Sequence, residues 1–115
     1  MITQENEKIA VDCLKVVLTL IHEQRYKELN TVVDKIHYDK LDEVLCFIEE
    51  SIYPYMIDGF DPEVEYHLYE LGGKKGFGLD YPLTSCGVKL SGILCLSFEY
   101  TDNGLVRIIH TIDAD

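Results

Sequence analysis

The spacing of apolar residues changes near Pro54, and this change most constrains the fold. Before Pro54 the apolar residues recur at the spacing of one side of an α-helix. After it they alternate with polar residues, as on a half-buried β-strand. A chain of 115 residues has the length of one domain. We therefore predict a single α+β domain over 1–115, with a helical part at 1–52 and an antiparallel sheet at 63–112.

The helical part contains three predicted helices. In the first, at 9–21, apolar residues cover most of the circumference, so the helix must be covered on two sides. Thr3 is expected to cap its start, because a threonine oxygen can accept from the first free backbone N–H groups. A short second helix is expected at 25–36. The third is expected at 39–52, and Pro54 stops it.

The sheet part contains about four predicted strands, which lie at 64–69, 77–83, 88–100 and 105–112. Glycines at 72–76 predict a turn, and Gly92 in the middle of the long strand predicts a bulge or bend. Asp102-Asn103-Gly104 predicts a hairpin. Alternation places four residues of the last strand on one face, namely Val106, Ile108, His110 and Ile112. We expect this sheet to curve around the first helix.

Acidic residues exceed basic residues throughout the chain. Asp and Glu number 21 and Lys and Arg 10, which gives a net charge of −11. Residues 1–57 hold 11 acidic and 6 basic residues, and 58–115 hold 10 and 4, so the halves carry −5 and −6. This field repels nucleic acid and anionic membrane and attracts a basic protein. No apolar run approaches the ~20 residues that a membrane span needs.

The four cysteines are predicted to be free thiols. Cys13 and Cys46 stand among apolar helix residues, where a thiol packs as a small hydrophobic group. Cys86 and Cys95 form no CxxC pair and no zinc-like spacing with a histidine. The N-terminal residues are acidic, whereas a signal peptide begins with basic residues. These features predict a reduced protein in the cytoplasm.

The segment 49–65 is the predicted partner-binding site, because it interleaves acidic and aromatic residues. Aromatic side chains anchor a bound protein, and carboxylates steer and pair with a basic one. The competing interpretation is a solvated loop whose aromatic rings close the bottom of the core. The predicted site residues are Glu49, Glu50, Tyr53, Tyr55, Asp58, Phe60, Asp61, Glu63 and Glu65.

Three tyrosines define an alternative site. Tyr66, Tyr81 and Tyr100 lie on predicted strands, where inward rings with polar tips can line an apolar pocket. The competing interpretation is that they are core residues with satisfied hydroxyl groups. We predict no catalytic residue, metal site or cofactor, because no motif in the chain has the required spacing. Asp80, the best candidate for a carboxyl with a raised pKa, is predicted to face solvent.

The order of elements and three short segments resemble a small uncharacterised bacterial domain family. Its fold is nuclear-transport-factor-like, or cystatin-like, and consists of a long helix held in a curved sheet. The segments are Tyr26-Lys27-Glu28-Leu29, Glu50-Ser51-Ile52-Tyr53-Pro54-Tyr55 and Leu79-Asp80-Tyr81-Pro82-Leu83. After Leu83 the chain departs from that pattern, with Thr84-Ser85-Cys86-Gly87. The resemblance implies a cone-shaped fold and no known activity.

Two hypotheses for function follow. The first is an immunity protein, a non-enzymatic domain that neutralises a basic toxin such as a nuclease. The second is a cone-fold pocket that binds a small apolar ligand, or a weak enzyme built on it. A homodimer formed through the sheet is a further expectation. A pocket requires a cavity of several hundred Å³, and an inhibitor requires salt-dependent association.

Overall fold

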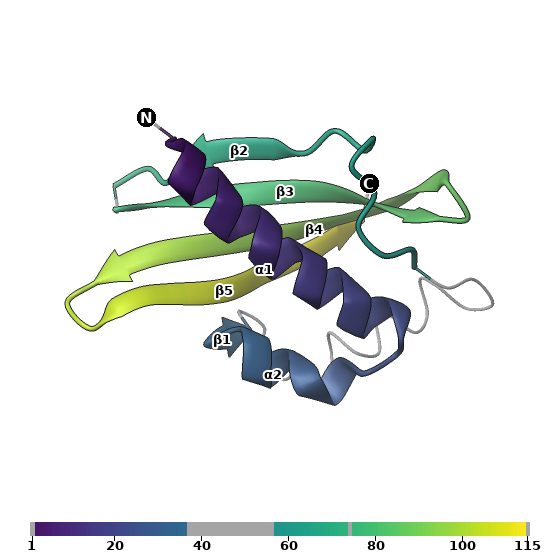
Figure 1. The fold of residues 1–115 in the computed structure, drawn as a ribbon, viewed down its shortest axis with the longest axis horizontal. Helices are drawn as coiled ribbons and strands as arrows, with labels where there is room; N and C mark the ends of the chain where they lie inside the picture. The colour runs from purple at the N-terminus through teal and green to yellow at the C-terminus, as the bar shows by residue number, and fades with distance from the viewer. Residues whose placement is uncertain (1, 37–56, 74, 115) are drawn as a thin grey trace.

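The computed structural model describes residues 2–36, 57–73 and 75–114. A long helix lies across one face of a sheet (Figure 1). The helices are α1 (Gln4–His22), a 3₁₀ turn η1 (Tyr26–Glu28) and α2 (Leu29–Val32). The strands are β1 (Lys35–Ile36), β2 (His67–Glu70), β3 (Gly76–Ser85), β4 (Val88–Thr101) and β5 (Gly104–Ala114).

The sheet has the strand order β1-β5-β4-β3-β2. The pairs β2–β3, β3–β4 and β4–β5 are antiparallel, and β1 runs parallel to β5. The predicted turn near 72–76 and the hairpin at 102–104 are confirmed, since they join β2 to β3 and β4 to β5. Gly92 lies in the stretch of β4 where the pairing with β3 shifts register, as the predicted bend requires.

The predicted fold class is wrong in its details, although the chain is α+β. We predicted three helices before an antiparallel sheet of about four strands. The described residues contain two α-helices and a mixed sheet of five strands. The predicted third helix, 39–52, lies outside the described residues.

The second predicted helix ends early because the backbone becomes extended at Val33 (φ −115°, ψ 153°). Asp34 then ties the chain to β5. Its N–H donates to the Arg107 carbonyl at 2.8 Å, and its carboxylate accepts from the Arg107 N–H at 2.8 Å. Lys35 and Ile36 therefore form the parallel edge strand β1 in place of the last helical turn.

The last strand also differs from the prediction. Cys95 pairs with Thr111, and the next residue of β4, Leu96, pairs with Ile109. His110 is therefore an extra residue in β5, and such a bulge interrupts the alternation of faces. As a result Ile112 stands opposite the buried Leu94, whereas Ile108 stands opposite Ser97 on the other side of the pleat. The four predicted residues do not share one face.

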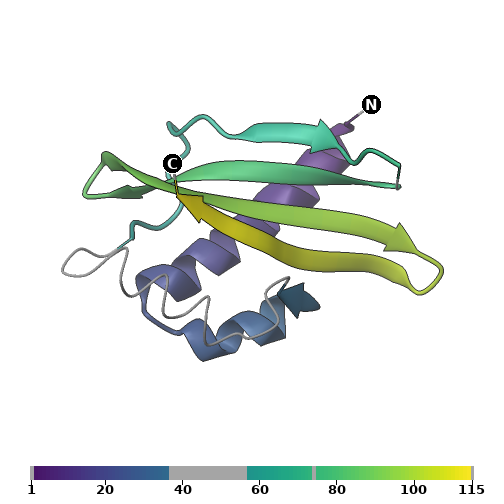
Figure 2. The ribbon, with the colours of Figure 1, turned by 180° about the vertical axis from the view of Figure 1, so that it is seen from behind.

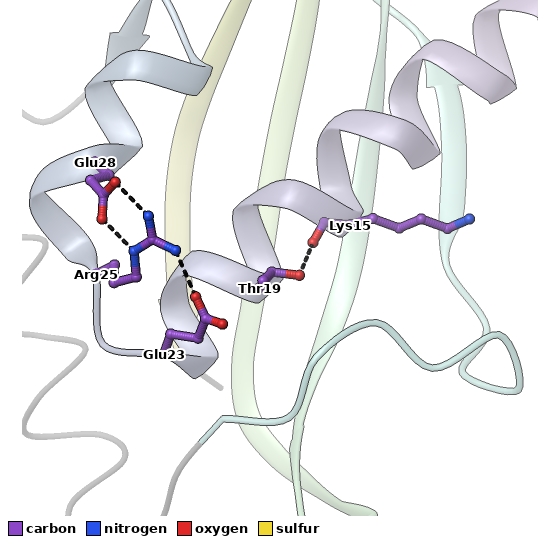
Figure 3. A network of polar contacts seen from close by, with 5 residues as sticks. All are labelled: Lys15, Thr19, Glu23, Arg25 and Glu28. Atoms are coloured by element: carbon purple, nitrogen blue, oxygen red, sulfur yellow. Dashed lines mark hydrogen bonds and ion pairs between the residues drawn. The ribbon is translucent and has the colours of Figure 1, made fainter.

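The start and end of α1 follow from local sequence. The Thr3 hydroxyl accepts from the Asn6 N–H at 3.0 Å, which confirms the predicted cap. At the other end Gln24 adopts a left-handed conformation with φ 60°. The Arg25 N–H then reaches the Leu20 carbonyl at 2.8 Å, and the Gln24 N–H reaches the Ile21 carbonyl at 3.0 Å, so these two carbonyls of the last turn are satisfied. The Arg25 guanidinium binds carboxylates on both sides of this corner (Figure 3).

The core lies between α1 and the side of the sheet that faces it. Phe77 and Phe98 are opposite each other on β3 and β4, and their rings stack with centroids 4.9 Å apart. The buried residues of α1 are Ala10, Cys13, Leu14, Val17, Leu18, Leu20 and Ile21. The sheet contributes Phe77, Leu79, Tyr81, Leu83, Leu94, Leu96, Phe98 and Ile109. Figure 2 shows the opposite side of the sheet, over which no described helix lies.

Two adjacent valines of α1 give a matched test of this packing. Val17 is 0% exposed and Val16 is 46% exposed. Val17→Asp should lower the free energy of unfolding by several kcal/mol, because it buries an unpaired charge. Val16→Asp should change it by less than about 0.5 kcal/mol. Urea unfolding of both variants measures the difference, and equal stabilities would contradict the position of α1.

Candidate functional site

The predicted site at 49–65 lies partly within the described residues. Glu49, Glu50, Tyr53 and Tyr55 lie outside them, so their roles stay predictions. The remaining part, residues 57–65, crosses from the end of α1 to the start of β2. Ile57 is buried, and its carbonyl lies 2.7 Å from Nδ1 of His22. Because a carbonyl only accepts, that ring nitrogen must carry the proton.

The Asp58 carboxylate serves an internal role. Its Oδ1 accepts from the Cys86 N–H at 2.9 Å. Its Oδ2 accepts from the Gly87 N–H at 2.9 Å and from the Thr84 hydroxyl at 2.8 Å. The Gly87 N–H, the Thr84 hydroxyl and the Cys86 N–H together hold the pKa of Asp58 below its ordinary value. Asp58, which lies outside the β3–β4 turn in the sequence, therefore holds the turn by accepting hydrogen bonds from it.

The β3–β4 turn needs this support because of its backbone. Two residues, Cys86 and Gly87, connect the strands, and both have positive φ, at 51° and 80°. A two-residue hairpin of this kind favours asparagine or glycine at its first position. Cysteine there is strained, and the hydrogen bonds to Asp58 hold its N–H in place. The exposed Cys86 thiol is a consequence of this turn.

Phe60 and Asp61 continue the attachment of the segment to the sheet. The Phe60 ring stacks on the buried Tyr81 ring with centroids 5.9 Å apart. The Lys15 ammonium of α1 lies 5.4 Å from the centre of the Phe60 ring. The Asp61 N–H donates to the Tyr81 hydroxyl oxygen at 3.1 Å. The Phe60 ring thus contacts the core through Tyr81 and a surface cation through Lys15.

The acidic side chains that face solvent lie at the end of the segment. Asp61 is half-buried as a residue, and its carboxylate accepts from the Glu63 N–H at 2.9 Å in a turn. Glu63 and Glu65 are exposed. Of the predicted acidic residues that the structure describes, Glu63 and Glu65 are the exposed ones, whereas Asp58 and Asp61 are half-buried.

The three tyrosines of the alternative site bind separate partners. The Tyr66 hydroxyl donates to the Glu7 carboxylate at 2.9 Å, and the Tyr100 hydroxyl donates to the Asn6 side chain at 2.9 Å. Both therefore hold the first turns of α1 against the sheet. Tyr81 is 1% exposed, and burial raises the pKa of its hydroxyl. The described contacts do not bring the three hydroxyl groups to a common point.

A cluster on the opposite face of the sheet was missed by the sequence prediction. His67 and Tyr69 lie on β2, with their rings stacked at 5.6 Å and 22°. The Tyr69 hydroxyl donates to the Asp80 carboxylate at 3.3 Å. We predicted that Asp80 faces solvent, but it is half-buried and bonded to this tyrosine. We call His67, Tyr69 and Asp80 the aromatic-carboxylate cluster.

Cross-strand register explains why the cluster was missed. His67 stands opposite Asp80, and Tyr69 stands opposite Gly78. Alternation already places His67 with Tyr69, and Gly78 with Asp80. Only the pairing of the two strands brings the four residues together. The glycine-rich turn at 72–73 was the sequence signal that could have predicted this pairing, because the turn of a hairpin fixes the register of its strands.

Metal-ligating side chains do not gather among the described residues. Within 2–36, 57–73 and 75–114 no group of three His, Cys, Asp or Glu side chains is placed to hold a metal ion. Cys13, Cys86 and Cys95 are free thiols, as predicted, and Cys46 lies outside the described residues. Burial raises the pKa of Cys13 to about 11, so this thiol is protonated near neutral pH.

Comparisons with known proteins add no relative. No protein-family model, curated protein or solved structure matches the chain. The resemblance to a cystatin-like bacterial family therefore stays a prediction. In the described part of the chain, no helix has both the length and the apolar character needed to span a membrane.

Asp58→Asn tests the internal role of this carboxylate. Asparagine replaces one acceptor oxygen with an NH₂ group, which cannot accept from the N–H donors of the turn. The free energy of unfolding should therefore fall by about 1–3 kcal/mol. Glu63→Gln is the control for charge and should change stability by less than about 0.5 kcal/mol. Guanidinium unfolding at neutral pH measures both, and equal effects would contradict the role of Asp58.

The difference in stability between wild type and Asp58→Asn should also depend on pH. The folded pKa of Asp58 is lowered, so its contribution is present above the ordinary carboxyl value of 3.8 and is lost as pH falls through the folded value. The stability difference between wild type and Asp58→Asn should therefore shrink below pH ~4. A difference that stays constant to lower pH would show that charge is not the cause.

Proposed function

We propose that this chain is a non-enzymatic domain that binds a basic protein, and specifically an immunity protein that neutralises a basic toxin such as a nuclease. The observation that carries the proposal is the excess of carboxylates. If all 10 Lys and Arg residues paired with one of the 21 Asp and Glu residues, 11 carboxylates would still lack a cationic partner. Such a field accelerates encounter with a basic protein and repels nucleic acid.

The placement of the basic residues supports this proposal. Lys8 pairs with Asp12 one turn along α1 at 2.8 Å. Arg25 binds the carboxylates of both Glu23 and Glu28 (Figure 3). These cations neutralise carboxylates beside them in sequence, and each pair is exposed. They therefore do little to neutralise carboxylates on other parts of the surface.

The segment 57–65 supplies the geometry of a first contact surface. Asp58 and Tyr81 attach it to the sheet, so its backbone is held before a partner arrives. Glu63 and Glu65 then present carboxylates beside this fixed segment. A preorganised surface loses less entropy on binding than a flexible one.

The pocket hypothesis has weaker support. Each hydroxyl group of Tyr66, Tyr81 and Tyr100 already has a protein partner. A cytoplasmic location belongs to the main proposal, and the three free thiols among the described residues support it. A homodimer through the sheet fits less well, because two copies that each carry −11 repel each other.

Charge reversal at Glu65 tests the proposal with a partner isolated at low salt. Glu65→Lys should slow association several-fold at low salt and flatten its salt dependence, with little change in dissociation. Asp102→Lys is the matched control, because it makes the same charge change at the β4–β5 turn, far from residues 57–65 (Figure 1). Stopped-flow or surface-binding kinetics over a salt series measure the rates. Failure to bind any basic protein at low salt would contradict the proposed function.

A further inference from the structure

The sheet has one face that no described helix covers. On β3 the buried residues Phe77, Leu79 and Tyr81 face α1, so Gly78 and Asp80 between them face the other way. Figure 2 shows this second face toward the viewer, with α1 behind the sheet. Half-buried apolar residues of β4 and β5 lie on it, including Ile93, Val106 and Ile108. We call it the open face.

Tyr69 lies flat on the open face because of a glycine. A Cβ atom added at Gly78 would lie 2.4 Å from Cζ of the Tyr69 ring and 2.6 Å from its hydroxyl oxygen. Only a residue without a side chain leaves room for the ring at this position. The ring therefore covers the β3 backbone, and its hydroxyl reaches Asp80 two residues further along the strand.

The electrostatics of the cluster favour a cation. Burial, and then the charge of Asp80, raise the pKa of Tyr69 to about 12, so the hydroxyl keeps its proton and donates to the carboxylate. The Tyr69 hydroxyl contacts Oδ1 of Asp80, and Oδ2 can accept a further hydrogen bond. Aromatic faces attract cations, and a neighbouring carboxylate adds to that attraction.

Among the described residues, the register row through Tyr69 brings no basic residue beside the cluster from β3, β4 or β5. Reading across the sheet from Tyr69, the register gives Gly78, Ser97 and Ile108 before it reaches a basic residue, Lys35 on β1. Lys35 therefore lies at the opposite edge of the sheet from β2. The row that contains Asp80 continues through Cys95 to Thr111.

We propose that the aromatic-carboxylate cluster on the open face is the anchor site for an arginine side chain of the basic partner. The guanidinium would lie against the His67 and Tyr69 rings and donate to Asp80. Arginine fits better than lysine, because its planar group stacks on rings and hydrogen-bonds at its edge. This inference rests on the proposed function and deepens it, since it assigns the anchor to the open face and leaves 57–65 a steering role.

The test uses the full chain and an octa-arginine peptide at low salt. In an NMR titration, the largest amide shifts should fall at 67–70, Gly78, Asp80 and 95–97, with small shifts in α1. Asp80→Asn should weaken affinity roughly three- to fivefold beyond Asp102→Asn, which removes the same charge at an exposed turn. Octa-lysine should bind the wild-type chain more weakly than octa-arginine.

Two further measurements keep the test independent of folding defects. Tyr69→Phe keeps the ring and removes the hydrogen bond to Asp80, so it should retain the same shift pattern with weaker affinity than wild type. Cys95 stands opposite Asp80, whereas Cys86 lies in the β3–β4 turn. Alkylation of Cys95 therefore reports on the cluster, and alkylation of Cys86 in the same sample is the control. Bound octa-arginine should slow alkylation of Cys95 relative to Cys86.

The outcomes separate this inference from the proposed function. Equal losses for Asp80→Asn and Asp102→Asn would overturn the anchor site, and so would shifts centred on 57–65. Either result would leave a basic partner in place as the proposed function. Absence of any octa-arginine binding at low salt would count against both.

Discussion

The contact between α1 and one face of the sheet determines the rest of this structure. Apolar residues occupy so much of α1 that seven of them are buried, and β3 and β4 supply the opposing surface. Tyr66, just before β2, and Tyr100 of β4 hold the first turns of the helix. Because α1 lies on one side, the residues that alternate with the core positions face the side of the sheet over which no described helix lies (Figure 2).

Periodicity predicted the elements whose signal is long. The first helix, its Thr3 cap, the long strand β4 and the last hairpin all appear where the spacing placed them. Features set by a few residues were not predicted. Strand β1 has two residues, which is too short for alternation to be recognised, and its existence depends on Asp34 bonding to β5. The extra residue His110 in β5 exists only relative to its partner strand.

The candidate site shows the same limit. Composition grouped the carboxylates at 49–65 as one acidic surface, but geometry gives them different roles. Asp58 bonds three donors around the β3–β4 turn, whereas Glu63 and Glu65 are exposed. Sequence cannot separate these roles, because the donors to Asp58 lie 26 to 29 positions away. Conversely, Asp80 accepts a hydrogen bond from Tyr69 on the neighbouring strand, and neither segment alone predicts this contact.

The division into a covered face and an open face is the central claim, and solvent paramagnetic relaxation enhancement tests it most directly. A soluble, uncharged gadolinium chelate broadens methyl signals that it can approach. Neighbouring residues of β4 and β5 provide the comparison. Ile93 and Ile108 should be broadened strongly, whereas Leu94 and Ile109, which are 0% and 1% exposed, should be protected. Equal protection of both sets would contradict the open face and with it the anchor site.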